Sequence, residues 1–153
     1  MQEGKRVTAS ALSSQETQKE SRLTQETTPD ITIRALRVRY IVAGNPNTPK
    51  EVLAKLAFDE LENIRRRVAE NPRTPVESLS ALAHDGKADV RLAVAENPNV
   101  PEQLLESLAF DEDADVRYGV AENPYIPSPI LERLAEDDNP YVAFRARKTL
   151  SLL

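Results

Sequence analysis

From residue 46 onward, apolar residues, prolines and charged residues recur with a period of 26 positions, in blocks 46–71, 72–97, 98–123 and 124–149. Within each block the apolar residues lie three and four positions apart, which is the spacing of one face of an α-helix. The most regular of them are the leucines at the eighth and eleventh places: Leu53, Leu79, Leu105 and Leu131, then Leu56, Leu82, Leu108 and Leu134. A period of this length indicates a stacked array, in which each unit buries its apolar face against its neighbours.

Each block is long enough for two short helices. Thr-Pro-x-Glu at 48–51 and 74–77 predicts a capping box at the start of the first helix, with the threonine as N-cap and proline as the first helical residue. The second helix is expected to begin near Asp113, or at Asn139 in the last block. It should end at the asparagine before the next block, because the following proline disfavours a helical conformation there.

The N-terminal segment has a different composition. Ser, Thr and Gln supply 13 of the first 28 residues, and apolar residues are too sparse to offset the entropy lost on folding. We therefore predict a disordered polar tail at 1–29, which serves as a solubilising leader or carries a short linear motif. Residues 30–153 are predicted to form an all-α solenoid of about four and a half repeats, in which 30–45 supplies only a second helix.

The segment IRRRVAENPRTPVESLSALAHD (64–85) resembles the pattern VRxxVAxNPxTPxxxLxxLAxD of the leucine-rich repeat variant family, and more distantly HEAT repeats. The resemblance extends over about 38–149 and implies a right-handed α-solenoid. It also implies that one helix layer is partly 3₁₀, although second halves of roughly nine residues favour a mainly α-helical layer. Some relatives carry an N-terminal cysteine cluster that binds an iron–sulfur centre, and this function is not carried over because the chain has no cysteine.

Composition excludes several kinds of chemistry. The absence of cysteine removes disulfides, thiolate metal sites and cysteine nucleophiles, and the single histidine removes multi-histidine metal motifs. No glycine-rich phosphate loop is present, and no apolar run approaches the ~20 residues that cross a bilayer. We therefore predict no catalytic, cofactor-binding or metal-binding residues, and we expect a non-enzymatic, cytoplasmic protein that does not bind membranes.

Two sets of repeated polar residues are predicted to be structural. Each carboxylate of the first set precedes an arginine by six positions, and should cap the second helix or pair with an arginine of its own or the next repeat. The asparagines of the second set should bond to local backbone at the helix end. The two sets are Asp59, Asp85 and Asp111 with Arg65, Arg91 and Arg117, and Asn45, Asn71, Asn97 and Asn123.

His84 aligns with Phe58, Phe110 and Glu136, and this alignment favours a partly exposed position over a catalytic base.

One column of residues varies between repeats. It directly follows the repeated Val-Arg pair and consists of Tyr40, Arg66, Leu92, Tyr118 and Phe144, which we call the variable column. The core face of this helix uses the Val and the residue four places later, so the column should point sideways or outward. Tyr and Arg are frequent interface anchors, and we predict that the column binds a partner. The alternative is that its rings pack between adjacent helices. A weaker second candidate is formed by Phe58, His84 and Phe110, with Tyr125.

Charge separates the classes of partner. Residues 46–153 carry a net charge of −7, whereas 1–45 carry +2. An acidic solenoid does not match the basic stripe expected for binding a phosphate backbone, so nucleic acid is an unfavoured partner. We predict a protein partner with a basic or amphipathic surface, and no cofactor. One alternative is nucleic-acid docking through Arg34, Arg37, Arg39 and Arg65–Arg67. The other is a small enzyme or chromophore-handling protein of HEAT type.

Overall fold

The computed structural model describes residues 32–153. By its contacts the chain divides into two compact units, Met1–Val38 and Arg39–Leu153. The tail predicted at 1–29 lies outside the described residues. The second unit contains all four complete repeats.

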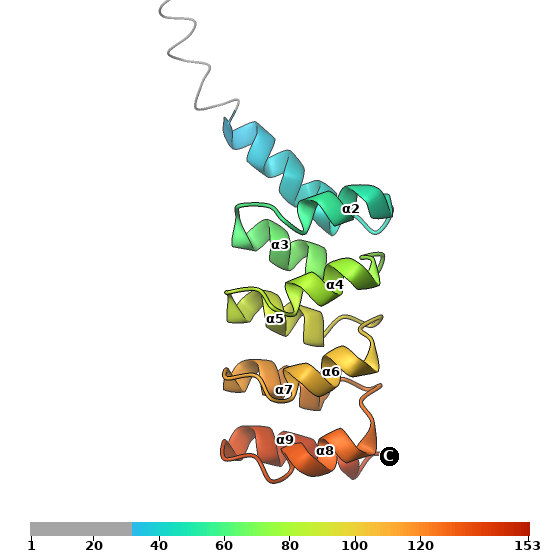
Figure 1. The fold of residues 1–153 in the computed structure, drawn as a ribbon, viewed down its shortest axis with the longest axis vertical. Coiled ribbons are helices and arrows are strands. Elements are labelled where there is room, and N and C mark those ends of the chain that lie inside the picture. The colour runs from blue at the N-terminus through green and yellow to red at the C-terminus, as the bar shows by residue number, and fades with distance from the viewer. Residues whose placement is uncertain (1–31) are drawn as a thin grey trace, which may run out of the picture. The chain divides into compact units, whose positions relative to one another are not determined.

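The described residues form helices and connecting loops, without a strand. After a helix that covers residues 32–44, two kinds of helix alternate along the chain (Figure 1). The first helices of the repeats are α2 (Lys50–Leu56), α4 (Val76–Leu82), α6 (Glu102–Leu108) and α8 (Ser128–Leu134). The second helices are α3 (Glu62–Ala69), α5 (Ala88–Ala95), α7 (Ala114–Glu122) and α9 (Pro140–Leu150). The predicted all-α solenoid is therefore confirmed.

Both helix layers are α-helical. The 3₁₀ geometry implied for one layer by the family resemblance is not found among residues 32–153. The second helices contact one another in succession, α3 with α5, α5 with α7 and α7 with α9. None of the helices within 32–153 is long and apolar enough to cross a bilayer.

The repeated apolar residues form one continuous core. The second helices α3, α5 and α7 each carry a fully buried alanine, Ala69, Ala95 and Ala121, which allows close approach. Leu56 is partly buried and packs against the core. Fourteen other repeated side chains are at most 2% exposed: Leu53, Leu79, Leu105, Leu131, Leu82, Leu108, Leu134, Ile64, Val90, Val116, Val142, Val68, Val94 and Val120. The core therefore runs through the stack, and each repeat completes that of its neighbour.

The predicted capping boxes are wrong. Pro49 and Pro75 are themselves the N-cap residues, and no side chain caps α2 or α4. The preceding threonine is buried, and its hydroxyl points back into the stack. Thr48 donates to the carbonyl of Val42 at 2.6 Å, and Thr74 donates to that of Val68 at 2.5 Å. The threonine thus satisfies the end of the previous helix instead of the start of its own.

The predicted starts of the later second helices are confirmed. The Asp113 carboxylate accepts a hydrogen bond from the Asp115 amide at 2.8 Å and caps α7. Asn139 accepts one from the Tyr141 amide at 2.9 Å and caps α9, with Pro140 at the first helical position. These short side chains satisfy amides that have no partner within the helix.

The continuous core generates a stability prediction. Leu82→Ala should lower the free energy of unfolding by about 2–5 kcal/mol, because it leaves a cavity between repeats that other side chains fill only in part. Phe58→Ala is the control, since the Phe58 side chain is 75% exposed and should contribute little. Urea denaturation of both variants measures the difference, and equal stabilities would show that the repeats do not share a core.

Candidate functional site

The repeated arginines link each repeat to the next. Nε and Nη2 of Arg91 donate to the two carboxylate oxygens of Asp111 at 2.7 and 2.8 Å, and both side chains are at most 10% exposed. The same two-bond pairing joins Arg65 to Asp85 and Arg117 to Asp137, whereas Arg39 bonds Asp59 once, at 2.7 Å. We call these four pairs the Arg–Asp ladder. The sequence prediction that each carboxylate caps the second helix or pairs with an arginine of its own or the next repeat is wrong, because each carboxylate pairs with the arginine of the previous repeat, 20 residues earlier.

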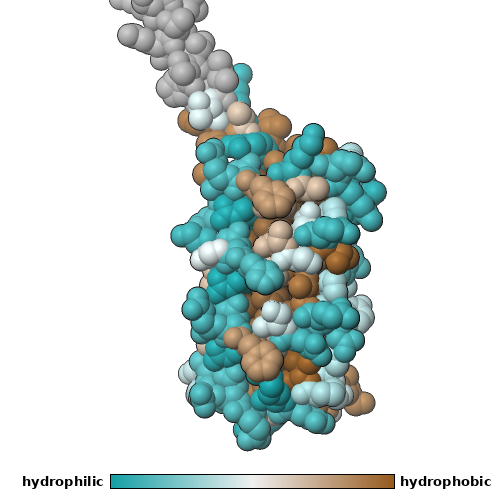
Figure 2. Space-filling model, viewed as in Figure 1, coloured by the Kyte–Doolittle hydropathy of each residue, from teal (hydrophilic) through white to brown (hydrophobic). Residues whose placement is uncertain are grey.

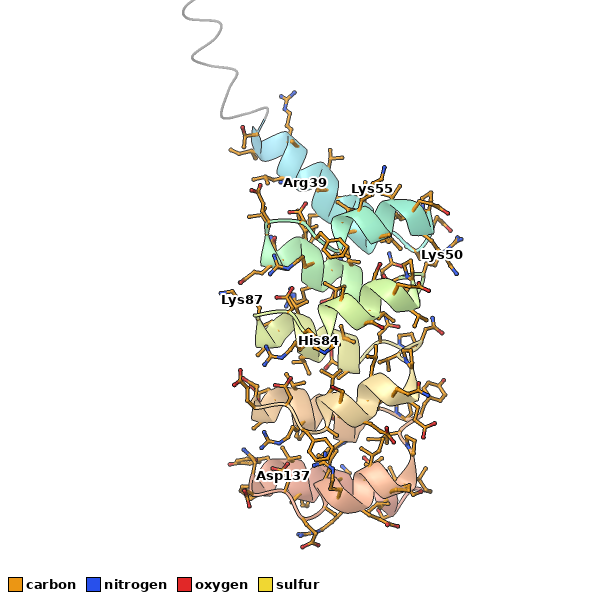
Figure 3. The ribbon with its side chains drawn as sticks, in the orientation of Figure 1. Arg39, Lys50, Lys55, His84, Lys87 and Asp137 are labelled. Carbon is orange, nitrogen blue, oxygen red and sulfur yellow. The ribbon has the colours of Figure 1, made fainter. Side chains whose placement is uncertain are left out.

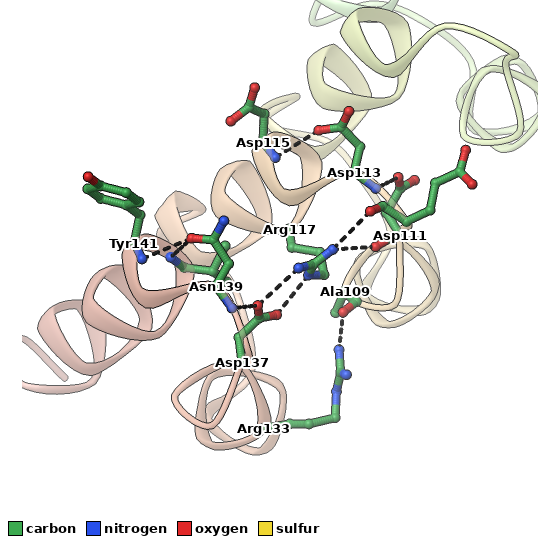
Figure 4. A network of polar contacts seen from close by, with 11 residues as sticks. Ala109, Asp111, Asp113, Asp115, Arg117, Arg133, Asp137, Asn139 and Tyr141 are labelled. Atoms are coloured by element: carbon green, nitrogen blue, oxygen red, sulfur yellow. Dashed lines mark hydrogen bonds and ion pairs between the residues drawn. The ribbon is translucent and has the colours of Figure 1, made fainter.

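The guanidinium groups of Arg65, Arg91 and Arg117 also bind the backbone of their own repeat. In addition to the ladder pair, Nη1 of Arg117 donates to the backbone carbonyl of Asp111 at 2.8 Å, as Figure 4 shows. The carboxylate of Asp137 in turn accepts the amide of Asn139 at 2.8 Å, just before α9. One arginine therefore ties the loop of its own repeat to the loop of the next. The repeated charges are therefore engaged with one another and with backbone groups in this architecture.

The ladder lowers the pKa of three of its carboxylates, Asp85, Asp111 and Asp137. The hydrogen bond from Arg117 lowers the pKa of Asp137 against the opposing effect of burial. For Asp85 and Asp111 burial is the largest influence and raises the pKa, but hydrogen bonds from Arg65 or Arg91 and from a backbone amide leave the pKa below its usual value. A carboxyl group whose pKa is lowered by folding stabilises the fold above its ordinary pKa of 3.8. That contribution is lost as the pH falls through the lowered value.

The repeated asparagines form a second link between repeats. Their Oδ1 atoms accept the amide two residues later, which is the local role that the sequence predicted. Their Nδ2 atoms also reach back 28 residues, to the carbonyls of the previous repeat. Asn71 donates to Ala43 at 2.8 Å, Asn97 to Ala69 at 2.6 Å and Asn123 to Ala95 at 2.8 Å.

Sequence reasoning missed this inter-repeat role. The available signal was Thr149, which stands 26 residues after Asn123. Its hydroxyl donates to the Ala121 carbonyl at 2.7 Å and replaces the asparagine amide. The local role of the asparagine needs only an oxygen that accepts the amide two residues later. Thr149 keeps a hydrogen-bond donor at the same position of the last repeat, and this indicates a bond to another part of the chain.

His84 occupies an exposed position, as expected. Its Nδ1 lies 2.9 Å from the carbonyl of Ser80, one turn earlier in the same segment. Among residues 32–153 there is no group of three or more histidines or carboxylates arranged to hold a metal ion.

The variable column lies along the second-helix layer, but its members differ in exposure. Phe144 is 67% exposed and Tyr40 is 38% exposed, and the Arg66 side chain is 44% exposed. Leu92 and Tyr118 are partly buried and pack against the core. The sequence offered two interpretations of the column, an outward-facing contact surface and packing between helices. Phe144, Tyr40 and Arg66 fit the first, and Leu92 and Tyr118 fit the second.

Two column residues line grooves between successive second helices. Arg66 lies beside a hollow of about 220 Å³ between α3 and α5, whose other walls are Glu62, Asn63, Asp89 and Val90. Tyr118 lies beside one of about 300 Å³ between α7 and α9, whose other walls are Ala114, Asp115, Asn139, Tyr141 and Val142. The two grooves occupy equivalent places in the repeat, so the same backbone arrangement presents Arg66 in one groove and Tyr118 in the other.

Leu92 instead packs inward against the core and towards the next repeat. A Cβ at Gly119 would clash with Cδ1 of Leu92, so glycine at position 119 gives this leucine room to pack. At the N-terminal end the equivalent residues are Tyr40 and Arg67, whose guanidinium lies 5.6 Å from the centre of the tyrosine ring. The packing of a column residue thus differs with its counterpart in the next repeat.

The second candidate column is the more exposed one. Phe58 and Phe110 are 75% and 71% exposed, and Tyr125 is 73% exposed. Figure 2 shows apolar side chains gathered in a band along the middle of the viewed face, between polar margins. His84, labelled in Figure 3, lies near the end of α4 in the middle of the same view.

The basic cluster proposed for nucleic acid is largely neutralised within the second unit. Arg39 and Arg65 belong to the Arg–Asp ladder. Arg66 and Arg67 both lie near Glu70, with nitrogen–oxygen distances of 3.6 and 2.8 Å. These arginines are therefore not available as a patch of unpaired positive charge.

Carboxylates line up on the second helices at Glu70, Glu96 and Glu122. Desolvation raises the pKa of Glu96, and the nearby carboxylates of Glu122 and Glu70 raise it further. Glu70 and Glu122 have arginine partners in Arg67 and Arg145. Negative charge on Glu96, the middle of these three carboxylates, is therefore unfavourable in the unbound protein.

The ladder predicts a sharp contrast between neighbouring carboxylates. Asp111→Ala should cost about 2–4 kcal/mol of unfolding free energy, because it leaves the Arg91 guanidinium buried without its partner. Glu112→Ala should change stability by less than ~0.5 kcal/mol, because that side chain is 91% exposed. Chemical denaturation at pH 7 measures both, and a near-neutral Asp111→Ala would contradict a structural role for the ladder.

Glu96 predicts the opposite sign. A folded-state pKa above the ordinary value of 4.5 means that the ionised carboxylate lowers stability at pH 7, and that this penalty disappears below about pH 4.5. Glu96→Gln should therefore raise the free energy of unfolding at pH 7 by less than ~1 kcal/mol, measured as a higher melting temperature. This gain in stability should vanish in acid. Glu132→Gln on α8 serves as the control. A loss of stability at pH 7 for Glu96→Gln would refute the unfavourable charge at this column.

Comparison with known proteins agrees with the geometry. A family model described as leucine rich repeat variant matches three consecutive segments, 62–86, 88–113 and 114–139. A search of curated proteins found none that matches the chain. The matched family is a helical, non-enzymatic repeat module of the kind typically used for protein interaction. With half of its residues covered by consecutive repeats, and with those repeats stacked in register, the chain belongs to the leucine rich repeat variant family.

Proposed function

We propose that this chain is a non-enzymatic interaction module that binds another protein through the variable column on its second-helix layer. The observation that carries the proposal is that recurring residues and variable residues have different roles in the structure. The residues that recur hold neighbouring repeats together, whereas the variable column (Tyr40, Arg66, Leu92, Tyr118 and Phe144) is not constant, and two of its members, Arg66 and Tyr118, line grooves.

The groove beside Tyr118 is the best candidate for the main contact. Tyr141 stands on its other side and is 76% exposed, and Asp115 and Asn139 add polar groups. Two tyrosines with neighbouring hydrogen-bonding groups are typical of an interface centre. Phe144, one turn beyond Tyr141 on the same helix, extends this apolar surface.

Charge supports a basic or amphipathic protein as the partner. The repeats carry a net charge of −7, and the unfavourable charge at Glu96 would be relieved by a cationic side chain. The pairing of Arg39 and Arg65–Arg67 with carboxylates argues against docking of a phosphate backbone through this end.

The proposal is tested by crosslinking in the source cell. A photoreactive residue in place of Phe144 should capture the same protein as one in place of Arg66, and one in place of Glu132 on α8 should not. Binding of the purified partner should then weaken at least about tenfold for Phe144→Ala and remain unchanged for Glu132→Ala.

Two outcomes would contradict the proposed function. One is equal capture from all three positions, which would show that the column is not the contact. The other is binding of random duplex or single-stranded nucleic acid at ~50 mM salt that weakens steeply as salt is added, which would favour the nucleic-acid alternative.

A further inference from the structure

Arg133 fills a site on the surface of its own chain. Its guanidinium carbon lies 3.5 Å from the centre of the Phe110 ring, and Nη2 donates to the backbone carbonyl of Ala109 (Figure 4). The surrounding groove, of about 460 Å³, is also lined by Asp111, Glu136, Asp137 and Asp138. We call this arrangement of ring, carbonyl and nearby carboxylates the Phe110 site.

The repeat places the same backbone frame at two further positions. In the Phe58 site the carbonyl belongs to Ala57, and the residue aligned with Arg133 is Ala81. In the His84 site the carbonyl belongs to Ala83, and the aligned residue is Ser107. Ala81 and Ser107 are too short to place a cation over the ring, and both are exposed. These two sites therefore have the frame of the Phe110 site without its guanidinium.

Both sites are suited to a cation. The groove beside His84, of about 480 Å³, is lined by Asp85, Asp111, Glu112 and Arg91; Asp85 and Asp111 are paired in the ladder, and the 91%-exposed Glu112 supplies a further carboxylate. The Phe58 ring is 75% exposed and is followed in the chain by Asp59, which is paired with Arg39, and by Glu60, whose side chain is 77% exposed. A planar guanidinium can stack on a ring and donate to a carbonyl at the same time, which a compact ammonium group does less well.

We propose that the Phe58 and His84 sites bind arginine side chains of an extended segment of a partner protein, in the way that Arg133 occupies the Phe110 site. These sites share no residue with the grooves of the variable column, so the inference goes beyond the surface proposed above. Packed helices lie about 8–10 Å apart, and a segment in polyproline II conformation advances about 3.1 Å per residue and presents every third side chain on the same face. Arginines three positions apart in the partner would therefore meet successive sites.

The test uses the full chain and a fluorescently labelled peptide in which two arginines are separated by two alanines. Binding is followed by fluorescence anisotropy and by NMR titration at peptide concentrations up to about 1 mM, which covers weak affinities. The peptide should shift signals of Phe58 and His84. A matched peptide with glutamine in place of both arginines should not bind, and one with lysine should bind more weakly.

Substitutions at the aligned position give a decisive comparison. Ala81→Arg should place the chain's own guanidinium on Phe58 and weaken peptide binding at least fivefold, whereas Ala81→Gln should leave binding unchanged. Arg133→Ala should open the Phe110 site and strengthen binding two- to threefold. Phe58→Ala should weaken binding as Ala81→Arg does, with thermal unfolding of every variant measured to confirm that the fold is retained.

The contradicting results are equally specific. The inference is overturned if the arginine peptide does not bind, if the glutamine peptide binds as well, or if Ala81→Arg binds as tightly as the unaltered chain. A partner whose binding is lost in Phe144→Ala but not in Phe58→Ala would leave the proposed function standing and refute this site. The reverse pattern would retain the arginine sites and refute the variable column as the main contact.

Discussion

The structure depends on one constraint: a pair of helices of seven to eleven residues cannot bury its apolar face alone, so each repeat must be held in register by its neighbours. Two polar contacts fix that register. The Arg–Asp ladder joins loops that are 20 residues apart in sequence, and the asparagine amides join helix ends that are 28 residues apart. Because these groups are largely buried, a shift of one repeat against the next would leave several of them without partners, at a cost of several kcal/mol.

Much of the fold could be predicted from the sequence because the period places equivalent residues side by side. The helical spacing of the leucines, the asparagine before each proline and the caps at Asp113 and Asn139 all led to the observed helices. The partner of each ladder arginine could not be predicted in the same way. Asp85 lies 20 residues after Arg65 and six before Arg91, and a translational repeat makes these two spacings indistinguishable until the helices are placed.

The errors and omissions also have physical causes. The threonines of the expected capping boxes are buried, and a buried hydroxyl bonds to whichever acceptor the packing provides, here the carbonyls of Val42 and Val68. The exposure of each residue in the variable column depends on the residue that it contacts in the next repeat. Leu92 packs inward where a Cβ at position 119 would clash with its side chain, and this pairing of neighbours is not encoded in the column itself.

The same symmetry suggests how a family of nearly identical units acquires specific surfaces. Substitutions at places outside the core and the two polar contacts alter the surface without disturbing the stack. One arginine, at position 133, covers the Phe110 ring, whereas the aligned positions near Phe58 and His84 hold Ala81 and Ser107.

The coupling of adjacent repeats by the repeated charged residues is tested most directly by a double-mutant cycle on Arg91 and Asp111, with Arg91 and Glu112 as the reference cycle. We expect a coupling energy above ~1 kcal/mol for the first pair and close to zero for the second, whose charged groups are 3.8 Å apart with the glutamate almost fully exposed. A first cycle as close to additive as the second would show that the buried pair does not hold the repeats together, and would contradict the role assigned to the ladder.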